Sequence, residues 1–313
     1  MSKIRNPDDL TAVVLAVMAQ TPDPRLREIM VSLVSHLHGF VRDVRLTEDE
    51  ARSASALIAR MGQLTNDSHN EVVLMAGSLG VSSLVCLLNN GQGAVGAEGA
   101  ANAGVRFDTT QNLLGPFWRM HSPRTANGAS IVRSPTPGAP WRVQARVVDV
   151  AGQPVAGAEV DVWHCDATGL YENQPQARAK GHADMNLRGK FTTDADGRFG
   201  FWSIKPIGYP IPTDGVVGPL LQAQNRHAMR PAHLHALAIK TGYKTLISQV
   251  YAHDDPNLAT DVQFGVTDAL TGQFVRHELA PAENPHLQTP WFSLDFTFIM
   301  EAGESKLPKA PIK

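Results

Sequence analysis

The chain has 313 residues, with 28 lysines and arginines against 30 aspartates and glutamates, giving a formal charge of −2. With no basic excess to neutralise a phosphate backbone, nucleic acid is not an expected partner. The length allows one large domain or two ordinary ones, each able to bury a core. No apolar signal segment opens the sequence and no stretch reaches about 18 apolar residues, which predicts a cytoplasmic protein without a membrane partner. Only two cysteines occur, so any metal must use nitrogen or oxygen ligands.

The first ninety residues have the apolar spacing of helices. Apolar residues recur at positions 26, 29, 30, 33, 34 and 37, and again at 57, 58, 61 and 64. Thr47 and Glu50 have the spacing of a capping box, which predicts that a helix over residues 51–61 begins after Thr47. A further apolar segment covers residues 72–88.

The second half of the chain changes to the period of strands. Four glycines within residues 91–100 predict a loop, and we place a domain boundary near it. Apolar residues then alternate with polar ones from Trp141 to Val147, which predicts a strand. Residues 194–197 have the composition of a hairpin turn before a strand at 199–202. Several short strands without helical patterns between them predict an antiparallel sandwich.

A pair of histidines is the sharpest local signal. His233 and His235 follow a proline in a segment with the pattern of a strand. Residues two apart on a strand point to the same face, so both imidazoles can reach one metal ion. The plain alternative is two half-exposed histidines on a polar face. His36 and His38 have the same spacing on a predicted helix, where side chains two apart diverge by about 200°, and we interpret that pair as structural.

Further ligands are not decided by this spacing. A carboxylate or a third histidine commonly completes such a site, and Asp254 and Asp255 stay open as candidates. Two of the four tyrosines, Tyr171 and Tyr209, stand in turns that contain glycine. Taken singly, each is interpreted as a packed aromatic with its hydroxyl at the surface.

Four segments, in the right order, resemble those of the intradiol ring-cleavage dioxygenases, iron(III) enzymes that act on catechol and hydroxyquinol. Residues 160–171 (VDVWHCDATGLY) resemble the segment that supplies a first tyrosinate, and residues 208–215 (GYPIPTDG) resemble that of the second. Residues 230–235 (RPAHLH) resemble the histidine strand, and residues 113–118 (LLGPFW) the loop that forms a wall of the substrate pocket. Together the matches extend over about residues 110–265.

The resemblance implies an α+β fold, with an N-terminal helical domain followed by a predominantly antiparallel β-sandwich catalytic domain. The expected parts are a helical dimerisation domain at 1–107, an iron-binding sandwich at 108–300 and a C-terminal tail at 301–313. Catechol and hydroxyquinol members carry such a helical domain at their dimer interface. The apolar face of residues 26–37 favours a homodimer.

The resemblance also implies the metal and its ligands. Tyr171, Tyr209, His233 and His235 are expected to hold one Fe(III) per subunit. Ferric iron is a hard cation that favours anionic oxygen, and two tyrosinates with a hydroxide would cancel its three charges. By resemblance, Tyr209 is the ligand that leaves when a diol binds, and its phenolate then serves as a base for one of the diol protons.

Two further residues are assigned through the family. Arg230 resembles the arginine that stabilises negative charge on the attacked ring, and Gln249 resembles its partner on the next strand. The alternatives are a surface ion pair for Arg230 and an ordinary strand residue for Gln249.

The expected substrates are hydroxyquinol and O₂, and the product is a muconate-type or maleylacetate-type diacid, because residues 209–218 and 261–266 resemble hydroxyquinol enzymes. Two departures leave catechol, a substituted catechol or a chlorinated hydroxyquinol as alternatives. Gly77 stands where hydroxyquinol members tend to carry an acidic residue, and Gln263 replaces an apolar wall residue. The side chains expected around the ring, for which core packing is the alternative at apolar positions, are Leu74, Gly77, Pro116, Phe117, Ile211, Pro212, Arg230 and Gln263.

Two other classes of function remain open at this point. One is a hydrolytic or extradiol-type enzyme in which His233, His235 and a carboxylate hold zinc or iron(II). The other is a non-catalytic β-sandwich that binds a partner or a sugar. The first predicts a colourless protein when zinc is bound, and the second predicts no stoichiometric metal and no O₂ consumption.

Overall fold

A computed structural model describes residues 4–66, 69–89 and 111–309, and the chain divides into two compact units, Met1–Arg60 and Met61–Lys313. The loop predicted at residues 91–100 and the proposed domain boundary at residue 107 lie outside the described residues. The division into a helical domain, a catalytic domain and a tail therefore stays a prediction.

The first unit is helical, as the apolar spacing predicted. It holds α1, α2 and most of α3, which extend over Pro7–Met18, Pro24–Asp43 and Glu48–Leu64. The predicted capping box at the start of α3 is present, because the Thr47 N–H donates to Glu50 Oε2 at 2.8 Å and the Glu50 N–H donates to Thr47 Oγ1 at 3.3 Å. His38 Nδ1 lies 2.9 Å from Thr11 Oγ1 on α1, whereas His36 Nδ1 donates to its own helix at the Ser32 carbonyl. These two histidines therefore have separate structural partners.

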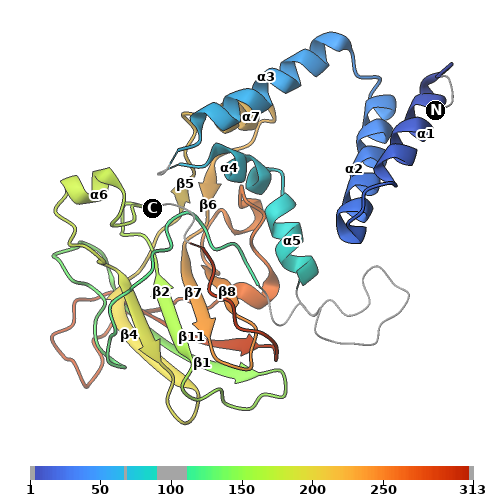
Figure 1. Ribbon diagram of the computed structural model, residues 1–313. Helices are drawn as coiled ribbons and strands as arrows, with labels where there is room; N and C mark the ends of the chain where they lie inside the picture. Colours follow the sequence, from blue (N-terminus) through green and yellow to red (C-terminus); the bar gives the residue numbers. More distant parts are fainter. Residues whose placement is uncertain (1–3, 67–68, 90–110, 310–313) are drawn as a thin grey trace. The chain divides into compact units, whose positions relative to one another are not determined.

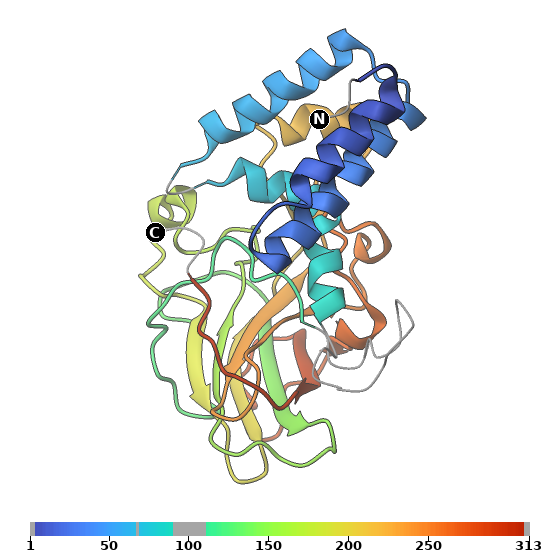
Figure 2. The same ribbon diagram turned by 45° about the vertical axis from the view of Figure 1, so that its right-hand side comes forward.

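The apolar segment 72–88 forms two helices rather than one. These are α4 (Glu71–Ser78) and α5 (Val81–Asn89), and the chain bends by 72° between them (Figure 2). Gly80 at this bend has φ +74°, a conformation that side chains with a Cβ rarely adopt. In the described part of the chain no single helix is long and apolar enough to cross a membrane. Among the described helices, α4 and α5 together have the length and apolar composition of a membrane span, but the bend interrupts them.

The second unit contains a sandwich of two sheets (Figure 1). One sheet has four strands in the order β10-β11-β1-β4, with bounds Val275–His277, Trp291–Met300, Pro140–Asp149 and Arg198–Ile204. The other has five strands in the order β3-β2-β7-β8-β9, with bounds Arg188–Thr192, Glu159–Trp163, His233–Ile239, Leu246–Ala252 and Thr271–Gly272. The shorter elements are β5 (Tyr209–Pro210), β6 (Met229–Arg230), α6 (Pro175–Ala179), α7 (Val217–Ala223), and the 3₁₀ turns η1 (Leu258–Thr260) and η2 (Asp268–Leu270).

The sheets are mixed, although most strand pairs are antiparallel as predicted. β1 pairs in parallel with β11, and β8 pairs in parallel with β9. The turn at residues 194–197 is present, with Gly197 at φ +74° and its N–H donating to the Asp194 carbonyl. It joins β3 to β4, which belong to different sheets, so the expected hairpin is wrong. A turn sequence fixes the local reversal, whereas strand pairing depends on the sheets that pack together.

The core lies between the two sheets, and alternation along each strand decides which residues enter it. On β7, Leu234, Ala236 and Ala238 belong to this core, whereas His233 and His235 point to the opposite face. The outer face of the five-stranded sheet therefore carries the histidines.

Candidate metal centre

The two histidines meet the two tyrosines on the outer face of the five-stranded sheet. Tyr171 comes from the segment that follows β2, and Tyr209 comes from the short strand β5. Their hydroxyl oxygens lie 3.1 Å apart. Tyr209 Oη is 3.3 Å from His233 Nε2, and Tyr171 Oη is 3.1 Å from His235 Nε2. The two Nε2 atoms are 3.2 Å apart, which closes a ring of four donor atoms.

This donor ring fits a single transition-metal ion. Metal bonds to histidine nitrogen are about 2.0–2.1 Å long, so neighbouring donors around one ion lie about 3 Å apart. His233 Nδ1 is 2.7 Å from the Pro231 carbonyl, which can only accept, so this nitrogen carries the proton and Nε2 presents a lone pair to the ring. Two phenol oxygens and two imidazole nitrogens form a hard donor set of the kind that suits iron. That the four residues bind a metal stays a prediction.

Burial sets the protonation of the donors. All four side chains are buried, with Tyr209 the most exposed at 8%. Burial, followed by the charge of Arg230, lowers the pKa of His233 to about 3. Burial, followed by the charge of His233, lowers the pKa of His235. Burial raises the pKa of Tyr209 to about 12 and, with Tyr209 next in effect, raises the pKa of Tyr171. The imidazoles are thus neutral as ligands require, whereas the phenols must lose protons when a cation binds.

Neighbouring aromatic rings hold the donors in place. Trp163 is the cross-strand neighbour of His235 on β2, and its ring stacks on the imidazole at 4.7 Å between centroids. Phe117 stacks on Tyr171 with the centroids 4.4 Å apart. Gly169, at φ +81°, lies against Tyr209, where a Cβ would come within 2.7 Å of the tyrosine Cβ. Only glycine fits at this close approach of the two tyrosine segments.

A buried ion pair lies directly beside Tyr171 in the chain. Glu172 accepts from Arg188 Nε at 2.7 Å, and both side chains are 1% exposed. Arg119 also donates to Glu172, at 2.8 Å. The Tyr171 N–H donates to Gln174 Oε1 at 2.7 Å. The backbone around Tyr171 is therefore held by charged and polar contacts on both sides.

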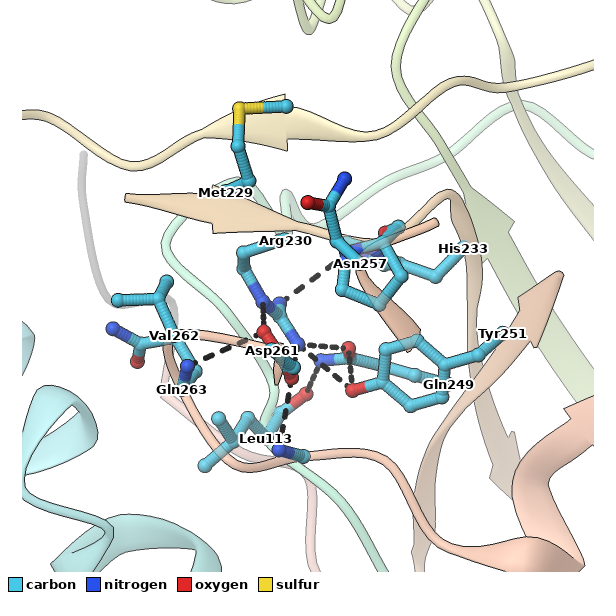
Figure 3. A network of polar contacts seen from close by, with 12 residues as sticks. Leu113, Met229, Arg230, His233, Gln249, Tyr251, Asn257, Asp261, Val262 and Gln263 are labelled. Carbon is cyan, nitrogen blue, oxygen red and sulfur yellow. Dashed lines mark hydrogen bonds and ion pairs between the residues drawn. The ribbon is translucent and has the colours of Figure 1, made fainter. Parts of the chain in front are cut away.

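Arg230 reaches the donor ring from β6 and is the centre of a buried polar network (Figure 3). Its Nη1 is 3.5 Å from His233 Nε2. Its Nη2 donates to Gln249 Oε1 at 2.9 Å, so the structure pairs these two predicted residues. Nη2 also donates to Tyr251 Oη at 2.8 Å, and Nε and Nη2 donate to Asp261 at 3.1 and 3.2 Å. Burial alone would lower the pKa of Arg230, but the negative charge of Asp261 holds that pKa well above its ordinary value.

No role was predicted from the sequence for Asp261 or Tyr251, which both bind Arg230. A signal for Tyr251 was available, because it lies two residues after Gln249 on β8 and therefore shares its face. The register confirms this arrangement, since Gln249 is opposite His235 and Tyr251 is opposite His233. Asp261 had no such signal, because it follows the turn η1 and meets Arg230 only in the tertiary structure.

The carboxylates considered as metal ligands have other partners. Asp254 pairs with Lys205 at 3.0 Å and is 40% exposed. Asp255 Oδ2 accepts the Ala232 N–H at 2.8 Å. Among the described residues no group of three or more histidine, cysteine, aspartate and glutamate side chains forms a metal site. A site of two histidines and a carboxylate therefore has no support here.

The predicted wall residues lie in different surroundings. Gly77 on α4 is buried against Gln263, whose side-chain amide occupies the space that a Cβ at position 77 would need. Gln263 Nε2 donates to Ser78 Oγ at 3.3 Å. Glu71, at the start of α4, accepts the Val217 N–H at 2.8 Å and so ties α4 to α7. Among the other predicted wall residues, the structure has Ile211 buried, Leu74 partly buried in the same apolar cluster, and Pro116 and Pro212 exposed.

Comparison with known proteins gives consistent results. A family model named "Dioxygenase" matches residues 113–298, and one described as "Catechol dioxygenase N terminus" matches residues 23–95. The chain is 38% identical to a 6-chlorohydroxyquinol 1,2-dioxygenase of Cupriavidus pinatubonensis, over 93% of this chain and 96% of that protein. It is 37% identical to a hydroxyquinol 1,2-dioxygenase of Rhizobium sp., over 92% of each. A crystal structure of hydroxyquinol 1,2-dioxygenase from Pseudomonas putida DLL-E4 superposes with a TM-score of 0.80 at 35% identity, covering 95% of this chain and 99% of that one.

Proposed function

This chain belongs to the family of intradiol ring-cleavage dioxygenases, and from this premise we propose that it opens the ring of hydroxyquinol (1,2,4-trihydroxybenzene) with O₂. Membership confirms the predicted resemblance and makes the protein an oxidoreductase. Both oxygen atoms would enter a maleylacetate-type diacid. The observation that carries the proposal is the ring of four donor atoms, in which each side is 3.1–3.3 Å long.

The family uses non-haem iron, and the proposed cofactor is one Fe(III) per subunit, held by Tyr171, Tyr209, His233 and His235. Ferric iron suits this set because two phenolates offset most of its charge, which a neutral four-nitrogen site could not do. When bound, it would supply the Lewis acidity that favours a dianionic diol and the electron-accepting character that makes the ring reactive toward O₂.

Two residues of the chain act on the diol in this proposal. Tyr209 Oη, once it is ionised, would act as a base in the donor ring and accept one diol proton. Arg230 Nη1 faces the donor ring and donates to negative charge that develops on the attacked ring. Gln249 holds Arg230 from β8 through Nη2.

The proposed ring pocket is formed by two walls. One wall is the segment of Pro116 and Phe117. It contacts the candidate metal centre through the Phe117 ring, which stacks on Tyr171. The other contains Leu74, Gly77 and Gln263. Because Gln263 carries an uncharged amide beside Gly77, it offers the third hydroxyl of the ring both a donor and an acceptor in place of a carboxylate. Ile211 and Pro212 follow Tyr209 in the chain and complete the proposed set.

The protein is further proposed to be a homodimer through its helical part. No residue of α2 is buried, and Leu26, Ile29 and Leu33 on this helix are 45–48% exposed. Leu37 and Phe40 extend the same apolar surface at 50% and 53%. A contiguous apolar surface of this kind marks an interface in ordinary proteins.

The absorption spectrum of aerobically purified protein tests the proposed function. Iron coordinated by tyrosinate gives a visible band, which should shift when hydroxyquinol is added, and an O₂ electrode should record stoichiometric uptake. Hydroxyquinol should give a higher kcat/KM than catechol. Tyr171→Phe should lose the band and at least about 100-fold of the activity, since even second-sphere partners of a metal are worth 10–100-fold.

Tyr243→Phe is the matched control, because it removes one phenol hydroxyl from a partly buried tyrosine that packs against the sandwich core. It should keep the band and the activity. A colourless zinc protein, or a Tyr171→Phe variant with full absorption and turnover, would contradict the proposed metal centre. A preference for catechol would contradict the proposed substrate alone.

A further inference from the structure

The guanidinium of Arg230 makes several hydrogen bonds on one edge and a single long contact on the other. On the bound edge, Nε and Nη2 donate to four acceptor atoms, which belong to Asp261, Gln249 and Tyr251. On the other edge, the only contact of Nη1 within the described part of the chain is His233 Nε2 at 3.5 Å. Figure 3 shows the bound edge turned toward Asp261, Gln249 and Tyr251. Because this single contact is long, Nη1 has protons available for a molecule beside the donor ring.

Both carboxylate oxygens of Asp261 accept hydrogen bonds from the bound edge of Arg230. Oδ1 accepts from Arg230 Nε at 3.1 Å, and Oδ2 accepts from Nη2 at 3.2 Å. The side chains of Arg230 and Asp261 are 5% and 2% exposed. A two-point contact fixes the plane of a guanidinium, whereas a single contact leaves it free to rotate. Because any buried anion would balance the charge, the distinctive contribution of Asp261 is this orientation.

The same carboxylate also organises the loop that carries Gln263. Oδ1 accepts the Gln263 N–H at 3.2 Å, and Oδ2 accepts the Gly265 N–H at 2.9 Å. Each oxygen therefore has one arginine donor and one backbone donor. The orientation of Arg230 and the course of the pocket loop consequently depend on one side chain.

Close packing limits what this loop can carry. A Cβ at position 265 would overlap the Tyr251 hydroxyl and come within 3.2 Å of Arg230 Nη2. The Gly265 carbonyl accepts from Asn112 Nδ2 at 2.6 Å, so the loop cannot easily move away. On the other side of the network, Gln249 Nε2 donates to the Leu113 carbonyl at 2.6 Å. The loop of Gly265 and the segment of Leu113 are thus both hydrogen-bonded to side chains that bind Arg230, namely Asp261 and Gln249.

We propose that Asp261 is a positioning residue, which holds the guanidinium of Arg230 so that Nη1 faces the bound diol. Glycine is required at position 265 because the loop passes directly over the contact between Asp261 and Arg230. The inference rests on the proposed function of Arg230. Asp261 does not touch the diol, and its effect on the chemical step acts through Arg230. Its two contacts with the pocket loop would instead affect the binding of the diol. Its loss should slow the chemical step and leave the iron in place.

A double-mutant cycle tests this inference. Asp261→Asn keeps the size of the side chain but loses the charge and one of the two acceptors, and it should lower kcat by about 10-fold to 100-fold. Placed in an Arg230→Met background, the same change should cost less than about 2-fold, because the group through which it acts is gone. The iron content and the visible band of the resting enzyme should be unchanged in Asp261→Asn.

The matched control is Asp254→Asn. Asp254 lies seven residues before Asp261, is 40% exposed and pairs with Lys205, so removing its charge should leave kcat unchanged. Equal losses from Asp261→Asn in both backgrounds, or full kcat in the single variant, would show that Asp261 has no role through Arg230. Full activity in Arg230→Met would instead overturn the role proposed for Arg230 itself, so the two failures are distinguishable.

Gly265→Ala provides a second route if Asp261→Asn does not fold. This variant keeps the Asp261 carboxylate, but its added methyl group would clash with the Tyr251 hydroxyl and crowd Arg230 Nη2. It should lower kcat by about 10-fold or more, again only where Arg230 is present, and weaken anaerobic binding of hydroxyquinol as read from the shift of the visible band. Unchanged kcat and binding in a folded Gly265→Ala protein would sink the inference.

Discussion

The two sheets of the sandwich share one core but use their outer faces differently. In the four-stranded sheet, Trp141, Val143 and Ala145 of β1 point into the core, whereas Gln144 between them is exposed. In the five-stranded sheet, β7 is buried on both faces and only Ile239 at its end is partly exposed. The first face therefore meets water with polar side chains, and the second carries the donor ring.

This difference shows what a buried site requires of a sheet. The outer face of the five-stranded sheet is buried in an apolar cluster that contains Trp118, Trp163, Tyr171, Tyr209 and Leu237, with Leu114 and Phe117 packed against it. Trp163 and Leu237 belong to β2 and β7 of the sheet itself, whereas Trp118 and Tyr171 come from segments between strands. A low-dielectric environment strengthens charge interactions at the site, and it makes each buried polar group costly unless it has a partner. We therefore expect mutations on the two faces to separate activity from stability.

The largest effect on activity is expected on the five-stranded sheet, at β7. His235→Gln replaces an imidazole by an amide of similar length and removes one of the four donors. The variant should lose at least about 100-fold in kcat/KM, since second-sphere partners of a metal alone cost 10–100-fold. Circular dichroism should show an intact fold, and metal analysis should show reduced iron. His36→Gln on α2 is the control, since its ring contacts Ser32 on its own helix, and it should retain activity.

The largest effect on stability is expected in the shared core, from the four-stranded sheet. Leu294 on β11 is 1% exposed and lies opposite Val143 of β1. Leu294→Ala should lower the free energy of unfolding by about 2–5 kcal/mol, because it removes buried methyl groups and leaves a cavity. The activity per folded molecule should stay near that of the native protein. A selective loss of kcat without loss of stability would show that the two faces are coupled.

The smallest effect concerns a carboxylate on the site face of β2. Asp161 is 4% exposed, and burial raises its pKa from 3.8 to about 6 despite Lys190 at 3.7 Å. In the unfolded chain Asp161 ionises near its ordinary pKa, so between these values the folded state binds more protons and stability falls as pH rises. Above pH 6 the full penalty is present.

Asp161→Asn should therefore raise the free energy of unfolding at pH 7.5 by about 1–3 kcal/mol, and the gain should vanish below about pH 4. Denaturant titrations at the two pH values measure it. Glu159→Gln is the matched control, because Glu159 lies two residues earlier on β2, faces the same Lys190 at 3.9 Å and is 37% exposed. It should give no such pH-dependent gain. An Asp161→Asn protein that is less stable at pH 7.5 would contradict the burial argument.

Sequence patterns predicted the local structure well where one element decided it. The capping box at Thr47 and the alternation from Trp141 to Val147 both have the geometry expected from their spacing. The same rule placed His233 and His235 on one face. Strand pairing was beyond these patterns, since the turn at 194–197 joins two sheets and β1 pairs in parallel with a strand about 150 residues later.

The candidate site divides along the same line. Histidines two apart on a strand must share a face because the pleat has a period of two, so the sequence by itself determined that pair. It also determined the family, through the tyrosine and histidine segments. Only the tertiary structure decided that Tyr171 and Tyr209 reach the histidines. It also decided that Asp261 binds Arg230, which lies 31 residues earlier in the chain. Spacing along the chain carries no information on how loops pack over a sheet, since that packing depends on side chains from every segment that covers it.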